Sequence, residues 1–150
     1  MTRAIIIDDE ALARSVIKNY LKNNQDVEVV SECANGFEGL KAIQDEKPDL
    51  VFLDIQMPKL SGFELLELLD EPPVIIFSTA FDEYALRAFE MSAADYLLKP
   101  YTRQRFEEAV NKALARIRDT GDNYSRIIET VKSEARPIDR IAVRNGSRIT

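Results

Sequence analysis

The sequence has 150 residues, 45% hydrophobic and 31% charged, with a formal net charge of −6 at pH 7. This composition is typical of a globular chain and excludes a disordered or fibrous one, and no apolar run approaches the ~20 residues needed to span a bilayer. The absence of histidine excludes imidazole catalysis and histidine metal sites, so any histidine in the mechanism must come from a partner. The single cysteine, Cys33, excludes an internal disulfide and fits a reducing cytosol.

The charge is unevenly distributed along the chain. Residues 121–150 contain six basic and four acidic residues and so have a net charge of +2. Because the whole chain has a net charge of −6, residues 1–120 have a net charge of −8. An acidic body does not hold DNA by itself, because phosphate contacts need a cationic surface. The change of sign marks a candidate domain boundary near residue 120.

Five apolar segments predict strands, and each is followed by a segment with the apolar spacing of a helix. The predicted strands are 4–7, 27–33, 50–53, 74–77 and 96–98, and the predicted helices follow at 11–23 and from 35, 61, 82 and 102. Residues that cap helices stand at four of these starts: Asn35 with Glu38, Ser61 with Glu64, Asp82, and Thr102. Strict alternation predicts an α/β fold, a doubly wound, flavodoxin-like five-stranded parallel sheet in the order 2-1-3-4-5 with helices on both faces.

The pattern changes after residue 120. The cluster Gly121-Asp122-Asn123 predicts a break, after which apolar spacing indicates a short amphipathic helix. The pair Asn145-Gly146 between alternating segments is typical of a β-hairpin, because a type I′ turn needs positive φ at both positions. We expect residues 1–120 to form one domain, 121–137 a linker that can be helical, and 138–150 the first strands of a truncated second domain.

Charged or hydroxyl-bearing side chains stand at the carboxyl ends of four predicted strands. Asp8 and Asp9 close the first strand, Asp54 the third, Thr79 the fourth and Lys99 the fifth. Each of them alone has an ordinary structural role as a turn, cap or solvated residue. Because the carboxyl ends of parallel strands meet at the edge where such sheets bind ligands, we expect the five together to form a site.

This residue set predicts phosphoryl chemistry around a hard cation. Converging carboxylates repel one another, and the oxygen-only donors point to Mg²⁺. An aspartate can then act as a nucleophile and form an aspartyl-phosphate. Lys99 would supply a fixed positive charge to the phosphoryl group, and Thr79 a hydroxyl donor.

Two other classes of protein use related sites. A haloacid-type phosphatase also has a nucleophilic aspartate and Mg²⁺, but usually places a second acid two residues later, where Gln56 stands. A flavodoxin-like cofactor binder needs a Gly/Ser/Thr-rich phosphate loop after the first strand, where Asp8-Asp9-Glu10 stands. A P-loop nucleotide enzyme is excluded because the chain lacks the glycine-rich lysine motif.

The runs 5–10 and 53–62, together with the pairs Thr79-Ala80 and Lys99-Pro100, resemble the signature of bacterial response-regulator receiver domains over residues 1–120. The resemblance implies a signalling switch that catalyses its own phosphorylation and slow dephosphorylation, with a sensor histidine kinase as partner. The implied roles are Asp54 as phosphoacceptor; Asp8, Asp9, Asp54 and the backbone carbonyl of Gln56 as Mg²⁺ ligands; Lys99 as phosphate-binding residue; Thr79 and Tyr96 as switch residues; and a commonly cis Lys99-Pro100 bond.

The same resemblance carries expectations about the switch. As Thr79 moves toward the phosphoryl group, Tyr96 would fill the vacated space and change the face made by the fourth helix, fifth strand and fifth helix. We expect this change to produce a phosphorylation-dependent homodimer. Gln56 and Phe81, each two residues beyond a site residue, are expected to flank the path of attacking water, and the bulk of Phe81 to slow dephosphorylation.

The runs 81–90 and 94–100 resemble the LytTR-type regulators, whose output is a largely β DNA-binding domain. This resemblance implies transcription regulation in the cytoplasm, with no membrane contact. DNA would be bound through the full-length output domain and not through this chain, in which that domain is cut off.

Overall fold

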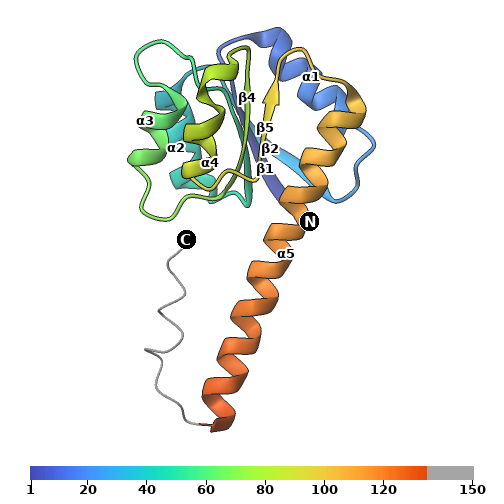
Figure 1. Ribbon diagram of the computed structural model, residues 1–150, viewed down its shortest axis with the longest axis vertical. Helices are drawn as coiled ribbons and strands as arrows, with labels where there is room; N and C mark the ends of the chain where they lie inside the picture. Colours follow the sequence, from blue (N-terminus) through green and yellow to red (C-terminus); the bar gives the residue numbers. More distant parts are fainter. Residues whose placement is uncertain (135–150) are drawn as a thin grey trace. The chain divides into compact units, whose positions relative to one another are not determined.

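A computed structural model describes residues 1–134 of the chain (Figure 1). The strands are β1 Thr2–Ile7, β2 Val27–Cys33, β3 Leu50–Leu53, β4 Val74–Thr79 and β5 Asp95–Leu98. The helices are α1 Ala11–Leu21, α2 Gly36–Glu46, α3 Gly62–Glu67, the 3₁₀ turn η1 Asp82–Tyr84, α4 Ala85–Glu90 and α5 Arg103–Glu134. None of the helices described is both long and apolar enough to cross a bilayer.

All five predicted strands are present, and they pair in parallel in the order β2-β1-β3-β4-β5. The predicted doubly wound α/β fold is therefore confirmed. Within the compact unit Met1–Leu114, Figure 1 shows α2, α3 and α4 on one face of the sheet, and α1 and the first turns of α5 on the other. A sheet covered on both faces explains why the central strands are continuous apolar runs.

Alternate strand residues pack against the two helical layers. Phe52 of β3 stacks on Phe106 of α5 with ring centroids 5.5 Å apart. Phe77 of β4 meets Phe63 of α3 edge-on at 5.2 Å, on the opposite face. This packing fixes the strands and with them the residues that follow their carboxyl ends.

Three of the four predicted helix caps are confirmed. The Asn35 side chain accepts from the backbone N–H of Glu38, and Ser61 and Glu64 form a complete capping box. The Thr102 hydroxyl accepts from the backbone N–H of Arg105 at 3.1 Å. These bonds satisfy amide groups that the first helical turn leaves without partners.

The fourth predicted cap is wrong. Asp82 lies inside the first turn of η1, Phe81 occupies the N-cap position, and no side-chain cap bond forms there among the described residues. The helix splits into a 3₁₀ turn and the short α4, which buries only Ala88. Leu86 and Phe89 consequently face outward, with 71% and 79% of their surface exposed.

The predicted break at Gly121 is also wrong, because α5 continues to Glu134. A glycine inside a helix costs about 1 kcal/mol relative to alanine, but it keeps its backbone hydrogen bonds and does not terminate the helix. The proposed division of the chain at residue 120 stays a prediction. The predicted hairpin at Asn145-Gly146 lies outside the described residues.

Candidate functional site

Two aspartates follow adjacent central strands. Asp8 comes directly after β1 and Asp54 directly after β3, which pair in parallel up to Ile7 and Leu53. The backbone N–H of Asp54 donates to the carbonyl of Ile7 at 3.0 Å, which prolongs the pairing. Both carboxylates are almost fully buried, with 1% and 5% of their residue surfaces exposed. The order of the strands therefore brings these two acids together, as predicted.

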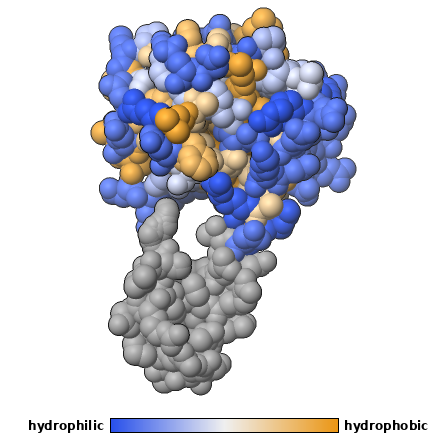
Figure 2. Space-filling model, viewed as in Figure 1, coloured by the Kyte–Doolittle hydropathy of each residue, from blue (hydrophilic) through white to orange (hydrophobic). Residues whose placement is uncertain are grey.

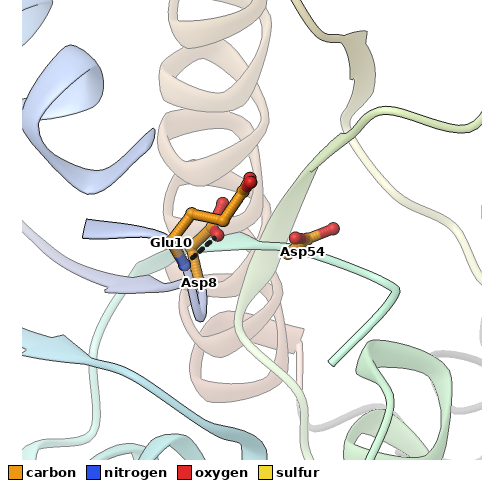
Figure 3. A group of neighbouring side chains, drawn as sticks. All are labelled: Asp8, Glu10 and Asp54. Carbon is orange, nitrogen blue, oxygen red and sulfur yellow. Dashed lines mark hydrogen bonds between the residues drawn. The ribbon is translucent and has the colours of Figure 1, made fainter. Parts of the chain in front are cut away.

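A third carboxylate completes the acidic group, and it belongs to Glu10. Oxygens of Asp8, Glu10 and Asp54 all lie within 4.8 Å of one another (Figure 3). The Asp8 side chain accepts a hydrogen bond of 2.9 Å from the backbone N–H of Glu10, which folds the chain into a tight turn. Asp9, the predicted third member, is exposed and lies outside this group.

Lys99 binds all three carboxylates. It follows β5, and its Nζ lies 2.9 Å from Asp8, 3.0 Å from Glu10 and 3.4 Å from Asp54. Burial alone would lower the pKa of Lys99, but its hydrogen bonds to Asp8 and Glu10 and the charge of Asp54 outweigh burial and raise that pKa. Lys99 therefore remains charged, and the structure places its ammonium beside Asp8, Glu10 and Asp54. The peptide bond between Lys99 and Pro100 is cis.

Asp54 differs from its neighbours in its unused hydrogen-bonding capacity. Its Oδ1 is buried and has no hydrogen-bond partner in the part of the chain whose side chains are described, residues 1–119. Burial and then the charge of Asp8 raise the pKa of Asp54 to about 6, although Lys99 opposes this rise. A carboxylate in this state gains from a cation or an incoming electrophilic group that removes its uncompensated charge.

Thr79 and Tyr96, the predicted switch residues, both form hydrogen bonds with the backbone of Phe81. Thr79 ends β4 and is fully buried, and its hydroxyl accepts a long hydrogen bond of 3.4 Å from the Phe81 N–H. The hydroxyl of the half-buried Tyr96 donates to the Phe81 carbonyl. Thr79 and Tyr96 are thus connected through the two peptide groups of one residue.

Gln56 lies in the loop after β3 and is exposed. Its Nε2 donates a 2.7 Å hydrogen bond to the hydroxyl of Tyr84, a residue whose role the sequence pattern did not reveal. Tyr84 reads in the sequence as one more apolar residue of a helix. Its hydroxyl acquires a role only because the loops after two neighbouring strands meet.

Comparison with known proteins agrees with this geometry. Residues 4–111 match the family described as the response regulator receiver domain. The chain is 49% identical, over 79% of its length and 48% of the relative, to the transcriptional regulatory protein BtsR of Escherichia coli strain K12. It is 44% identical, over 87% of its length and 56% of the relative, to an uncharacterized response regulatory protein of Yersinia pestis.

Solved structures show the same fold. The response regulatory domain of protein mrkE from Klebsiella pneumoniae matches with a TM-score of 0.72 and 34% identity, covering 78% of this chain and 98% of that one. The REC domain of AraT, a response regulator from Geobacillus stearothermophilus, matches with a TM-score of 0.73 and 32% identity, covering 80% and 98%. The chain spans about half the length of the curated relatives it matches. On the strength of the match over residues 4–111, the chain belongs to the family of response regulator receiver domains.

Proposed function

We propose that this chain is the phosphorylated switch of a two-component system and that Asp54 accepts the phosphoryl group. The observation that carries this proposal is the buried Oδ1 of Asp54, which no described residue satisfies, beside a lysine Nζ 3.4 Å from the other carboxylate oxygen. A buried polar oxygen without a partner is costly and calls for an explanation. A nucleophile that acquires its partner during the reaction supplies that explanation.

In the proposed step an oxygen of the Asp54 carboxylate attacks phosphorus and forms a new P–O bond. The bond between phosphorus and the donor breaks, and its electron pair leaves with the donor group. That group is acetate when the donor is acetyl phosphate, and neutral imidazole when it is a ring-protonated phosphohistidine. Because the chain has no histidine, the phosphohistidine would belong to a partner, a sensor histidine kinase.

The residues of the site fit a hard divalent cation. The donors are all oxygens, three carboxylates lie within 4.8 Å of one another, and one buried oxygen has no described partner. We infer Mg²⁺, held by Asp8 and Asp54, with Asp9 and the backbone carbonyl of Gln56 as the further ligands that the family resemblance implies. When bound, the ion would neutralise charge on the phosphoryl oxygens. Lys99 supplies the second positive charge.

The proposed readout begins at Thr79. A phosphoryl group adds roughly −1.5 to −2 charge and three strong acceptors, which would draw the Lys99 ammonium and the Thr79 hydroxyl toward it. Since the Phe81 N–H donates to Thr79 and the Phe81 carbonyl accepts from Tyr96, movement of Thr79 would alter the bond that holds Tyr96. This connection supports Tyr96 as the residue that carries the change to the surface.

The surface that would respond is the face of α4, β5 and the first turns of α5. It exposes Leu86 and Phe89 at 71% and 79% and Leu98 at 44%. Figure 2, in the same view as Figure 1, shows hydrophobic residues at the surface in the region of α4. Neighbouring exposed apolar side chains favour an interaction surface, and we infer that phosphorylation promotes a homodimer through this face.

The relatives support a role in transcription. BtsR is a transcriptional regulatory protein about twice as long as the matched region, since the match covers 48% of it. We propose that a LytTR-type DNA-binding domain follows this receiver in the whole protein. We further propose that the relay operates in the cytoplasm, where the single Cys33 would stay reduced.

Intact-mass measurement after incubation with acetyl phosphate and Mg²⁺ tests the proposal. We expect one added phosphoryl group on the parent chain and on Asp70→Asn, an exposed acid outside the site, and none on Asp54→Asn. A phosphatase, the competing class, would consume many equivalents of the donor. Donor consumption far above one equivalent within the lifetime of the added phosphoryl group, or equal labelling of Asp54→Asn, would contradict the proposal.

A further inference from the structure

A side-chain hydrogen bond joins the loops that follow β3 and β4. Gln56, two residues after Asp54, donates from Nε2 to the hydroxyl of Tyr84 at 2.7 Å. Because β3 and β4 are neighbours in the sheet, these loops border the carboxyl end of β3, where Asp54 lies. The bond therefore joins the loop that begins at Asp54 to the segment that follows the neighbouring strand β4.

Tyr84 is the fixed member of this pair. Its ring is half-buried and meets the ring of Phe63 at 5.8 Å and that of Phe81 at 6.2 Å, both edge-on. Phe63 is in turn buried against Phe77 of β4. Gln56 is exposed, and its long side chain has many rotamers in water. The hydroxyl consequently selects one position of the carboxamide.

We propose that Tyr84 is a positioning residue that holds the Gln56 carboxamide across the gap between these loops and so restricts the access of water to the phosphoryl group on Asp54. This inference rests on the proposed function. It adds a residue outside the acidic site that sets the lifetime of the phosphorylated state.

The reaction that the pair restrains is hydrolysis. A water oxygen attacks phosphorus, the P–O bond to Asp54 breaks, its electron pair returns to the Asp54 carboxylate, and the protons of the water leave with phosphate. The attacking water must approach opposite the breaking bond. While its N–H donates to Tyr84, the carboxamide cannot use that donor to bind and orient a water. Without the Tyr84 hydroxyl, the Gln56 side chain would leave the gap between the two loops open, and its N–H could bind and orient the attacking water.

Tyr84→Phe tests the inference, because it keeps the packed ring and removes the hydroxyl. After phosphorylation with acetyl phosphate and Mg²⁺ and removal of the donor, loss of the added mass should be about threefold faster than in the parent, the scale of one net hydrogen bond. In a Gln56→Ala background the same substitution should have no effect. Tyr20→Phe, on α1 and away from this pair, should match the parent.

An unchanged or slower loss in Tyr84→Phe would overturn the inference, and so would an equal acceleration in the Gln56→Ala background. The hydrogen bond has a readout that needs no phosphorylation. The Gln56 side-chain NH₂ resonances should exchange slowly with solvent in the parent and faster in Tyr84→Phe, and identical exchange would also overturn it. A parent chain that gains no phosphoryl group would instead overturn the proposed function, and with it the role in hydrolysis.

Discussion

The charge balance at single residues governs the site. Lys99 serves Asp8, Glu10 and Asp54 at once, with Nζ distances between 2.9 and 3.4 Å. One positive charge cannot neutralise three carboxylates, so the group retains negative charge that favours a divalent cation. Glu10 differs from the other two in being exposed, which makes it the member that can be changed with least effect on folding.

Removing the Glu10 carboxylate should weaken cation binding. In Glu10→Gln we expect a two- to fivefold lower affinity for Mg²⁺, about the effect of one screened charge within 4.8 Å of the other acids. Chemical-shift titration of the backbone amides with Mg²⁺ measures this affinity. Glu71→Gln, an exposed acid in the loop before β4, serves as the control. Equal Mg²⁺ affinities of Glu10→Gln and the parent would show that Glu10 contributes only to its ion pair with Lys99 and not to cation binding.

The raised pKa of Asp54 makes stability depend on pH. The folded-state pKa is about 6, above the value near 4 of an unfolded chain, so folding favours the protonated form. This contribution to stability is fully present below about pH 4 and is lost as the pH rises through about 6. Between pH 5 and 8, without divalent ions, the parent should lose on the order of 1 kcal/mol of unfolding free energy relative to Asp54→Asn. Urea unfolding of both proteins measures the difference, and a constant difference would contradict the shift.

At the scale of elements, α3 approaches the phosphoacceptor loop closely. The backbone N–H of Gly62 donates to the Ile55 carbonyl at 2.9 Å. A Cβ on Gly62 would collide with the Asp54 carbonyl oxygen and lie 3.1 Å from the Cα of Ile55. The start of α3 therefore packs directly against the backbone of Asp54 and Ile55 and helps to fix the position of the Asp54 side chain.

Gly62→Ala should disturb both stability and chemistry. We expect a loss of about 1–3 kcal/mol in unfolding free energy, because backbone must move, together with slower phosphorylation of Asp54. Ser61→Ala, which removes only the neighbouring cap, should cost about 1 kcal/mol and leave the phosphorylation rate near that of the parent. Equal phosphorylation rates for Gly62→Ala and the parent would show that the contact does not position Asp54.

The outward face of α4 should matter for association and not for folding. Replacing Leu86 and Phe89 together by serine removes side chains that are 71% and 79% exposed, so stability should change by less than about 0.5 kcal/mol. Sedimentation with and without a beryllofluoride mimic should show dimers of the parent and monomers of the double variant. Leu12→Ser, equally exposed at 78% but on α1, should still dimerise. A parent of unchanged mass with the mimic would reject the dimer.

At the scale of the whole molecule, the sheet was predictable because its strands are buried on both faces. Continuous apolar runs such as Leu50–Leu53 are stable as strands only inside a sheet that is covered on both faces. Parallel pairing of such strands then brings Asp8, Asp54 and Lys99 to one edge of the sheet. Once the alternation is recognised, the position of these three residues follows from topology.

Details that depend on local turns were not predictable in the same way. Whether Asp9 or Glu10 joins Asp8 is decided by the hydrogen bond from the Glu10 N–H to the Asp8 side chain, which periodicity does not reveal. The role of Tyr84 depends on two loops that meet only in the folded chain. The continuation of α5 through Gly121 reflects how weakly one residue's helix propensity opposes its neighbours.

The central claim is that one buried carboxylate, and no other, receives the phosphoryl group. Borohydride reduction converts an aspartyl-phosphate to homoserine, and peptide mass mapping then locates the modified residue. After treatment with acetyl phosphate and Mg²⁺, we predict homoserine at position 54 alone. Homoserine at Asp8, Asp9 or any other aspartate, with Asp54 unchanged, would contradict the account.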